Sequence, residues 1–130
     1  MHGLRKPRER VSYELADFPK AIKHHTKHLA ITKELGHRVE EGWAYGNRGN
    51  AYAWLVDFDK AITDQSQSLA ITKKMGNRWA EGRAYGNLGN CHIHMNELVQ
   101  AIAYAQAQHI LATELGLSEQ NAGPSSALYG

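Results

Sequence analysis

The chain nearly coincides with itself when it is shifted by 40 residues. The two clearest copies share runs of identical residues: Asp17-Phe18 recurs as Asp57-Phe58, Leu29-Ala30-Ile31-Thr32-Lys33 as Leu69-Ala70-Ile71-Thr72-Lys73, and Ala44-Tyr45-Gly46-Asn47 as Ala84-Tyr85-Gly86-Asn87. A third, weaker copy keeps Ala101-Ile102 and Glu114-Leu115-Gly116. A fixed period of this length is typical of a stack of one supersecondary unit. The sequence therefore indicates a protein that holds a partner, not a globule built around a private active site.

Length and charge set broad limits. The 130 residues are enough for one domain, which buries roughly two thirds of the surface of its unfolded chain. The net charge of +2 is too small to indicate a nucleic-acid or membrane partner. The basic residues of the N-terminus, Arg5, Lys6, Arg8 and Arg10, read as a solvated arm over residues 1–10. Nucleic-acid binding through this arm is the weaker alternative.

Cysteine usage bears on the compartment. A single cysteine, Cys91, cannot form an internal disulfide, which is consistent with a reducing, intracellular environment. Cys91 replaces Ala51 of the preceding copy, so we expect a small buried residue and not a reactive thiol. The sequence shows neither an apolar signal segment near Met1 nor an apolar run long enough to cross a bilayer. We therefore expect a cytoplasmic protein.

Within each period the apolar residues follow helical spacing. One helix is predicted from about Asp57 to Met75, with Asp57 as its N-cap and Gly76 ending it in a left-handed conformation. Asp17 and Gly36 take the same roles one repeat earlier. Further helices are predicted over about 38–56 and 78–95. Because few residues separate successive helices, neighbours should pack antiparallel.

The second kind of helix carries conspicuous glycines. Its predicted buried stripe comprises Tyr45, Gly49, Tyr52 and Leu55. Glycine inside a helix costs about 1 kcal/mol relative to alanine, so its repetition needs a reason. We expect close approach of the facing helix, most firmly at Gly49 and Gly89 and less firmly at Gly46 and Gly86. A phosphate-binding glycine loop would need a preceding strand, and none is predicted.

These features resemble the tetratricopeptide repeat (TPR) family. The matching residues are Tyr85, Leu88-Gly89 and Ala101, repeated as Tyr45, Gly49, Tyr52, Phe58 and Ala61. The period exceeds the usual 34 residues, and the stretches 81–90 and 69–76 resemble the long-repeat subgroup that includes the Pins-type G-protein-signalling modulators. The resemblance implies an all-α fold, in which antiparallel helix pairs stack as a right-handed superhelix, and a protein-binding function.

The repeat also sets the expected domain organisation. A TPR-like domain over 11–116 would hold a partial repeat (11–36) and two repeats (37–76 and 77–116). The segment 117–130 is degenerate, because Asn121-Ala122-Gly123-Pro124-Ser125-Ser126 breaks the next helix. Within the repeats the sequence departs from the family pattern at four places. The pattern expects a buried leucine, which Leu88 provides in one repeat, but Arg48 stands at that position in the preceding one. Gln65 and His25 occupy a usually aromatic site, and His92 replaces the tyrosine seen at Tyr52.

The candidate site is a second stripe on the glycine-bearing helices. Spacings of 4, 3 and 4 residues align two sets of side chains: Trp43, Asn47, Asn50 and Trp54, then Arg83, Asn87, Asn90 and His94. Asparagine amides both donate and accept hydrogen bonds, an arginine fork suits a carboxylate, and tryptophans anchor interfaces. By resemblance, this stripe lines a concave groove that binds an extended, acidic peptide segment of a protein partner. Alternatively, the asparagines satisfy local backbone groups, and the tryptophans pack on a neighbouring repeat or a second chain.

Metal binding and catalysis find little support. His24 and His28 have the spacing of helical metal ligands, but the matching Asp64 and Ser68 extend no ligand set, so neither a metal nor a cofactor is expected. His94, if it contacts an acidic ligand, would strengthen binding below about pH 6.5. The paired carboxylates Glu40-Glu41 and Asp57/Asp59 have no evident partner or depth to tune their pKa, so no enzymatic activity is expected.

Self-association is the main alternative to peptide binding. A solenoid without polar capping helices leaves apolar ends that favour dimers or end-to-end stacking. Apolar residues in both terminal segments are compatible with such a homo-oligomer: Val11, Tyr13, Leu15, Leu128 and Tyr129.

Overall fold

The computed structural model describes residues 17–116, which form five α-helices and no strand. The helices are α2 (Phe18–Leu35), α3 (Arg38–Trp54), α4 (Phe58–Met75), α5 (Arg78–His94) and α6 (Leu98–Glu114). The predicted helices are confirmed, with ends within two residues of those expected. The predictions for the basic arm, for residues 11–16 and for the segment 117–130 lie outside the described residues.

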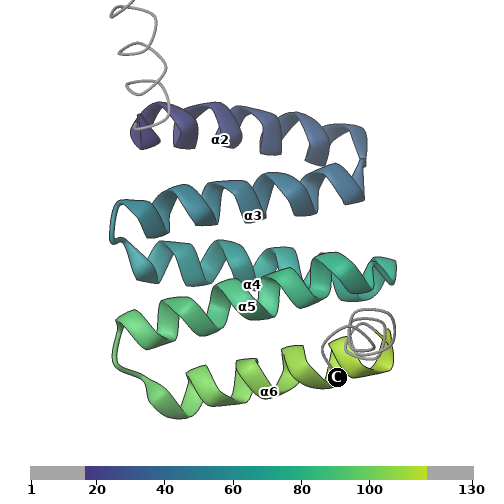
Figure 1. The fold of residues 1–130 in the computed structure, drawn as a ribbon. Coiled ribbons are helices and arrows are strands. Elements are labelled where there is room, and N and C mark those ends of the chain that lie inside the picture. Colours follow the sequence, from purple (N-terminus) through teal and green to yellow (C-terminus); the bar gives the residue numbers. More distant parts are fainter. Residues whose placement is uncertain (1–16, 117–130) are drawn as a thin grey trace, which may run out of the picture.

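Each helix packs against its neighbours in the chain, and the five helices form one continuous stack (Figure 1). Successive helices run antiparallel, since the α3–α4 and α5–α6 turns lie at one end of the stack and the α2–α3 and α4–α5 turns at the other (Figure 1). Helix α3 also touches α5, although α4 separates the two in sequence. The fold is therefore an all-α helical repeat solenoid, as predicted. No helix within residues 17–116 has both the length and the apolar character needed to span a bilayer.

The predicted caps account for the helix boundaries. The Asp17 carboxylate accepts a hydrogen bond from the Lys20 backbone N–H at 3.1 Å, and the Asp57 carboxylate accepts one from Lys60 N–H at 3.3 Å. Gly36 and Gly76 each have φ of 72°, the left-handed conformation that glycine adopts without strain. Both predictions, an aspartate N-cap and a left-handed glycine end, are confirmed in the two copies.

The prediction for Leu55 is wrong. Helix α3 ends at Trp54, so Leu55 is its C-cap residue and its side chain is 43% exposed. The 3.6-residue period that places Tyr45 and Gly49 in the core no longer applies once the chain leaves the helix. The next residue, Val56, turns the chain with φ of 64°, and its repeat-mate Asn96 does the same with φ of 61°.

Close packing explains some of the glycines. A Cβ added to Gly49 would lie 2.9 Å from Gln65 Nε2 and 3.2 Å from Asp64 Cβ, so glycine is needed for α4 to approach α3 this closely. The same expectation for Gly89 is wrong. An added Cβ there would lie 3.6 Å from Tyr104 Cβ, an ordinary van der Waals contact that requires no glycine.

Arg48 replaces the expected core leucine by an ion pair. Its Nε and Nη2 donate to the two carboxylate oxygens of Asp64 at 2.7 and 2.8 Å, and Asp64 is buried. In the next repeat the two positions are Leu88, fully buried, and Tyr104. The departure in α3 is thus matched by a second departure in α4. Hydrogen bonding to Asp64 raises the pKa of Arg48, so the guanidinium stays charged.

Candidate peptide-binding groove

All eight predicted site residues line a series of three pockets on the side of the stack where α3 and α5 adjoin. Trp43 and Arg83 line the first pocket, of about 470 Å³. Both also reach a middle pocket of about 70 Å³, which Asn47, Asn50 and Asn87 share. The third pocket, of about 610 Å³, is lined by the remaining site residues together with two of those asparagines: Asn50, Trp54, Asn87, Asn90 and His94. Because neighbouring pockets share residues, the three form one groove, called here the α3–α5 groove.

The first pocket joins two tryptophans and an arginine. Trp43 is about half exposed and Trp79 is largely exposed; both line the pocket with Arg83, while Leu111 of α6 supplies an apolar wall. Arg83 makes no ion pair within the described residues. Its neighbour Arg78 is engaged with Glu81 and Glu114 on the same repeat. Arg83 is therefore the guanidinium of this pocket that is left for a ligand.

Trp79 is a groove residue that the sequence reasoning missed. It corresponds to Val39 in the preceding repeat, so the repeat pattern itself carries no aromatic signal there. Its position four residues before Arg83 extends the candidate stripe by one helical turn. Continuing that stripe to the start of α5 would have included it.

The middle pocket is narrow and lined with amides. Gln65 Nε2 donates to the Gly46 carbonyl oxygen and to Asn50 Oδ1, both at 3.0 Å. Gln65 is buried, so this pair of bonds holds the Asn50 side chain in place. The Asn50 amide nitrogen makes no hydrogen bond within residues 17–116. The Asn50 oxygen thus bonds a side chain of the next helix and not a local backbone group, and the amide nitrogen remains as a donor.

The third pocket is mainly apolar. Trp54, Val56 and Phe58 line it, with the buried Cys91 in its wall. The Phe58 and His94 rings stack with centroids 5.1 Å apart, and Phe18 and Trp54 stack one repeat earlier at 5.5 Å. Trp54 therefore packs on a neighbouring helix, as the alternative supposed, and is still 70% exposed. Burial raises the pKa of the Cys91 thiol, which favours its neutral form.

Comparison with known proteins shows which family has this architecture. The tetratricopeptide repeat family matches residues 40–107, slightly more than half of the chain. The chain belongs to the tetratricopeptide repeat family. Its fold is similar to that of the TPR domain of Arabidopsis FLU, with a TM-score of 0.71 and 21% identity over 78% of this chain and 85% of that one. None of the curated proteins compared with the chain matches it.

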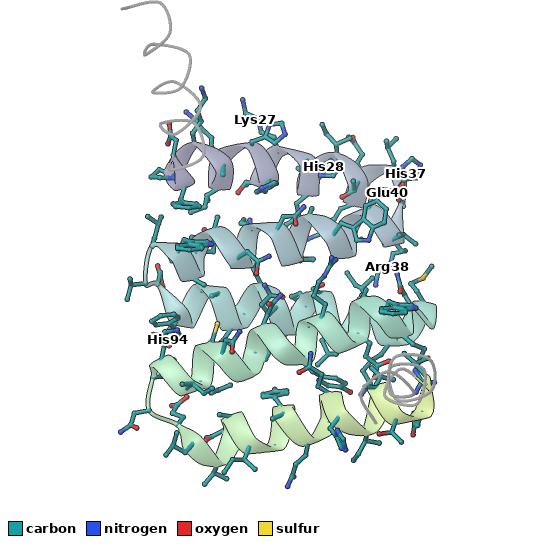
Figure 2. All side chains as sticks on the ribbon, in the orientation of Figure 1. Lys27, His28, His37, Arg38, Glu40 and His94 are labelled. Carbon is teal, nitrogen blue, oxygen red and sulfur yellow. The ribbon has the colours of Figure 1, made fainter. Side chains whose placement is uncertain are left out.

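In TPR terms, α3 and α5 are the first helices of successive repeats, and α4 and α6 are the second helices. The groove lies along the first helices, and its lining contains basic side chains but no acidic ones. Among the residues that line the three pockets, the ionisable side chains are Arg78, Arg83, His94 and Cys91, without an aspartate or glutamate. Figure 2 shows His94 at the end of the stack where α5 turns towards α6. This TPR groove thus offers amides, a free guanidinium and aromatic surface to a ligand.

The other ionisable clusters of the TPR fold have structural roles. Glu41 was expected to lack depth and a partner, and this is wrong: it is buried and bonds Arg38 at 2.8 Å. Asp57 caps α4. Within residues 17–116, no three histidine, cysteine or acidic side chains gather in a way that suits a metal ion. Burial, followed by the charges of His24 and His28, lowers the pKa of His25.

Proposed function

We propose that this TPR protein is a scaffold that binds an extended, acidic segment of a partner protein in the α3–α5 groove. One observation carries the proposal: the groove is lined by five asparagines and by Arg83, which makes no ion pair within residues 17–116, and none of its three pockets is lined by a carboxylate. Such a surface attracts a negatively charged chain and does not repel it.

Different groove residues would contact different parts of the ligand. Asn50 and Asn90 would hydrogen-bond the ligand's main chain. The Asn50 amide nitrogen would donate, because Gln65 already engages its oxygen, and the Asn90 amide could both donate and accept. Arg83 would bind a carboxylate through two parallel N–H donors. Trp43 or Trp54 would cover an apolar side chain. Most such contacts are individually modest, and a few anchors dominate the affinity.

Three finer features complete the proposal. The 40-residue period supports membership in the long-repeat, Pins-type subgroup, with repeats at 37–76 and 77–116. A lone, buried cysteine supports a cytoplasmic location. The roles of the carboxylates as caps and ion pairs support a non-catalytic scaffold.

The test is a displayed-peptide selection on the wild type and on the Asn50→Ala/Asn90→Ala variant. Gln67→Ala/Gln106→Ala is the matched control, because it removes two exposed amides outside the three pockets. We expect acidic peptides to be enriched on the wild type and the control and lost on the groove variant, with unchanged circular dichroism. Equal enrichment on all three proteins would contradict binding in the groove.

Self-association is a second candidate function, favoured by helix α6. Residues 98–113 contain no aspartate, glutamate, lysine or arginine. Val99 is 80% exposed and Ile110 is 57% exposed. Their repeat-mates in α4, Asp59 and Ala70, also stay exposed although α5 packs on α4. If a further repeat packed on α6 as α5 packs on α4, Val99 and Ile110 would therefore remain exposed to water. The α6 helix of a second copy could cover them, and no charged side chains would repel each other there.

Sedimentation velocity over a range of concentrations tests the second candidate. We expect a dimer that the Val99→Asp/Ile110→Lys variant dissociates. The control, Thr63→Asp/Ala70→Lys, places the same charges on exposed positions of α4 and should leave the dimer intact. A mass of one chain at every concentration would refute self-association.

A further inference from the structure

We propose that the α3–α5 groove recognises a two-part signal in its ligand. A carboxylate would bind at the Arg83 end and an apolar side chain at the Trp54 end, about five residues apart in an extended chain. This inference rests on the proposed peptide-binding function and adds the ligand's class and spacing to it.

The Arg83 end is built for a carboxylate beside apolar surface. Arg83 lies in the 470 Å³ pocket with Trp43 and Trp79 and has no acidic partner among the described residues. Glu81 and Glu114 are held by Arg78, so they do not neutralise Arg83. An arginine fork that is free and flanked by aromatic surface suits a carboxylate better than a neutral group.

The Trp54 end is built for an apolar side chain. It is the roomier pocket, of about 610 Å³, and its lining contains no lysine, arginine, aspartate or glutamate. Val56 adds apolar surface there although its φ of 64° is unfavourable for a β-branched residue. The repeat-mate at this turn is Asn96, which suits the same conformation, so the turn itself does not demand a valine. Strain retained at a pocket wall supports a role for Val56 in contacting a ligand.

The centre of the groove separates these two ends. The middle pocket, of about 70 Å³, is far too small for a large side chain and is lined with the amides of Asn47, Asn50 and Asn87. A main chain with small side chains fits this centre, and its N–H and C=O groups would meet amide partners. The specificity of the groove therefore lies at its ends.

Helix geometry sets the spacing. Trp43 and Trp54 are eleven residues apart on α3, as are their repeat-mates Arg83 and His94 on α5. At 1.5 Å per residue, eleven helical residues span about 16 Å. An extended chain advances about 3.3 Å per residue, so it covers this length in about five residues.

A spacing series of fluorescent peptides tests the inference by anisotropy. Each peptide carries one glutamate and one leucine with zero, two, four, six or eight serine and glycine residues between them, in either order, so that the two lie one, three, five, seven or nine residues apart. We expect tightest binding near a five-residue separation in one of the two orders. The peptide whose glutamate and leucine are adjacent should bind about tenfold more weakly, because only one anchor can then be engaged. The peptide whose two anchors lie nine residues apart should bind about two- to threefold more weakly, because a longer flexible chain must form a loop to engage both.

Single variants assign the two ends. Arg83→Gln should remove the advantage of glutamate over glutamine and keep the advantage of leucine over serine. Trp54→Ala should do the reverse. Lys27→Gln is the control for Arg83→Gln, because it removes one positive charge from the exposed face of α2, away from the three pockets (Figure 2). It should change neither preference.

The outcomes separate this inference from the proposed function. If peptides bind, and Asn50→Ala/Asn90→Ala abolishes binding, but affinity is independent of spacing, the two-part signal is refuted and the groove stands. If the selection itself enriches no peptide that depends on Asn50 and Asn90, the proposed function fails and the two-part signal fails with it. A spacing optimum that survives both Arg83→Gln and Trp54→Ala would refute the assignment of the two ends.

Discussion

Arg48 shows how one repeat holds a charge where the next holds a leucine. Its guanidinium bonds Asp64 through two nitrogens and donates to Thr26 Oγ1 at 3.2 Å. It also lies 5.8 Å from the ring centre of Tyr45 and 6.0 Å from that of Tyr52. The side chain thereby links α2, α3 and α4. The attraction between Arg48 and Asp64 compensates the cost of removing both charges from water, so losing either partner leaves the other charge buried without compensation.

Separating this pair should be far more costly than replacing it. Arg48→Leu alone leaves Asp64 buried without a partner and should lower the free energy of unfolding by about 3–5 kcal/mol. Arg48→Leu/Asp64→Tyr, which copies Leu88 and Tyr104, should recover most of that loss. Chemical denaturation of the single and double variants measures both effects. Losses that simply add would contradict the coupling.

Val56 offers a second test at the level of one residue. A left-handed conformation costs an ordinary residue roughly 1–2 kcal/mol, and a β-branched side chain tolerates it poorly. Val56→Asn, which copies Asn96, should therefore raise the free energy of unfolding by about 1 kcal/mol. The reciprocal change, Asn96→Val, should lower it by a similar amount. Opposite or absent shifts in thermal denaturation would contradict the strain.

At the level of the helix, the caps differ between repeats. The Asn77 side chain accepts a hydrogen bond from the Ala80 backbone N–H at 3.2 Å and caps α5. Its repeat-mate His37 precedes α3 and makes no side-chain cap hydrogen bond. The two helices have the same length and the same place in their repeats, but a side chain accepts a hydrogen bond from a first-turn N–H group only in α5.

Exchange of these caps should shift stability in opposite directions. His37→Asn should raise the free energy of unfolding by about 0.5–1 kcal/mol, because the asparagine would satisfy an N–H at the start of α3. Asn77→His should lower it by about 1 kcal/mol. Urea denaturation of both variants provides the measurement, and equal stability of all three proteins would show that neither cap matters.

At the level of the whole molecule, the stack should unfold from its outer helices. Only two residues are buried in each of the outer described helices, Leu29 and Thr32 in α2 and Ala101 and Leu111 in α6, against six in α4. In a linear repeat protein, each unit is stabilised mainly by its neighbours. The inner helices therefore carry most of the shared interface.

Native-state hydrogen exchange should follow this gradient. Backbone amides of α3, α4 and α5 are expected to exchange most slowly, and those of α2 and α6 faster by at least about tenfold, because local opening of an outer helix disrupts less packing. Uniform protection from α2 to α6 would instead indicate a single cooperative unit.

Much of the fold was predictable because its causes are local. The 40-residue period, the caps Asp17 and Asp57 and the left-handed glycines Gly36 and Gly76 depend on residues within a few positions of each other. The exposed stripe from Trp43 to Trp54 follows from helical periodicity alone. All eight predicted site residues line the groove for that reason.

The remaining features depend on which helices meet. The partner of Arg48 is Asp64 on the next helix, and the oxygen of Asn50 is engaged by Gln65, also from α4. Trp79 and Trp43 share a pocket only because α5 lies beside α3. The sequence by itself therefore determined the repeat, the helices and the stripe of eight side chains that lines the groove. Only the tertiary structure decided how these side chains pair and how the groove divides, because both depend on distances between helices that periodicity does not encode.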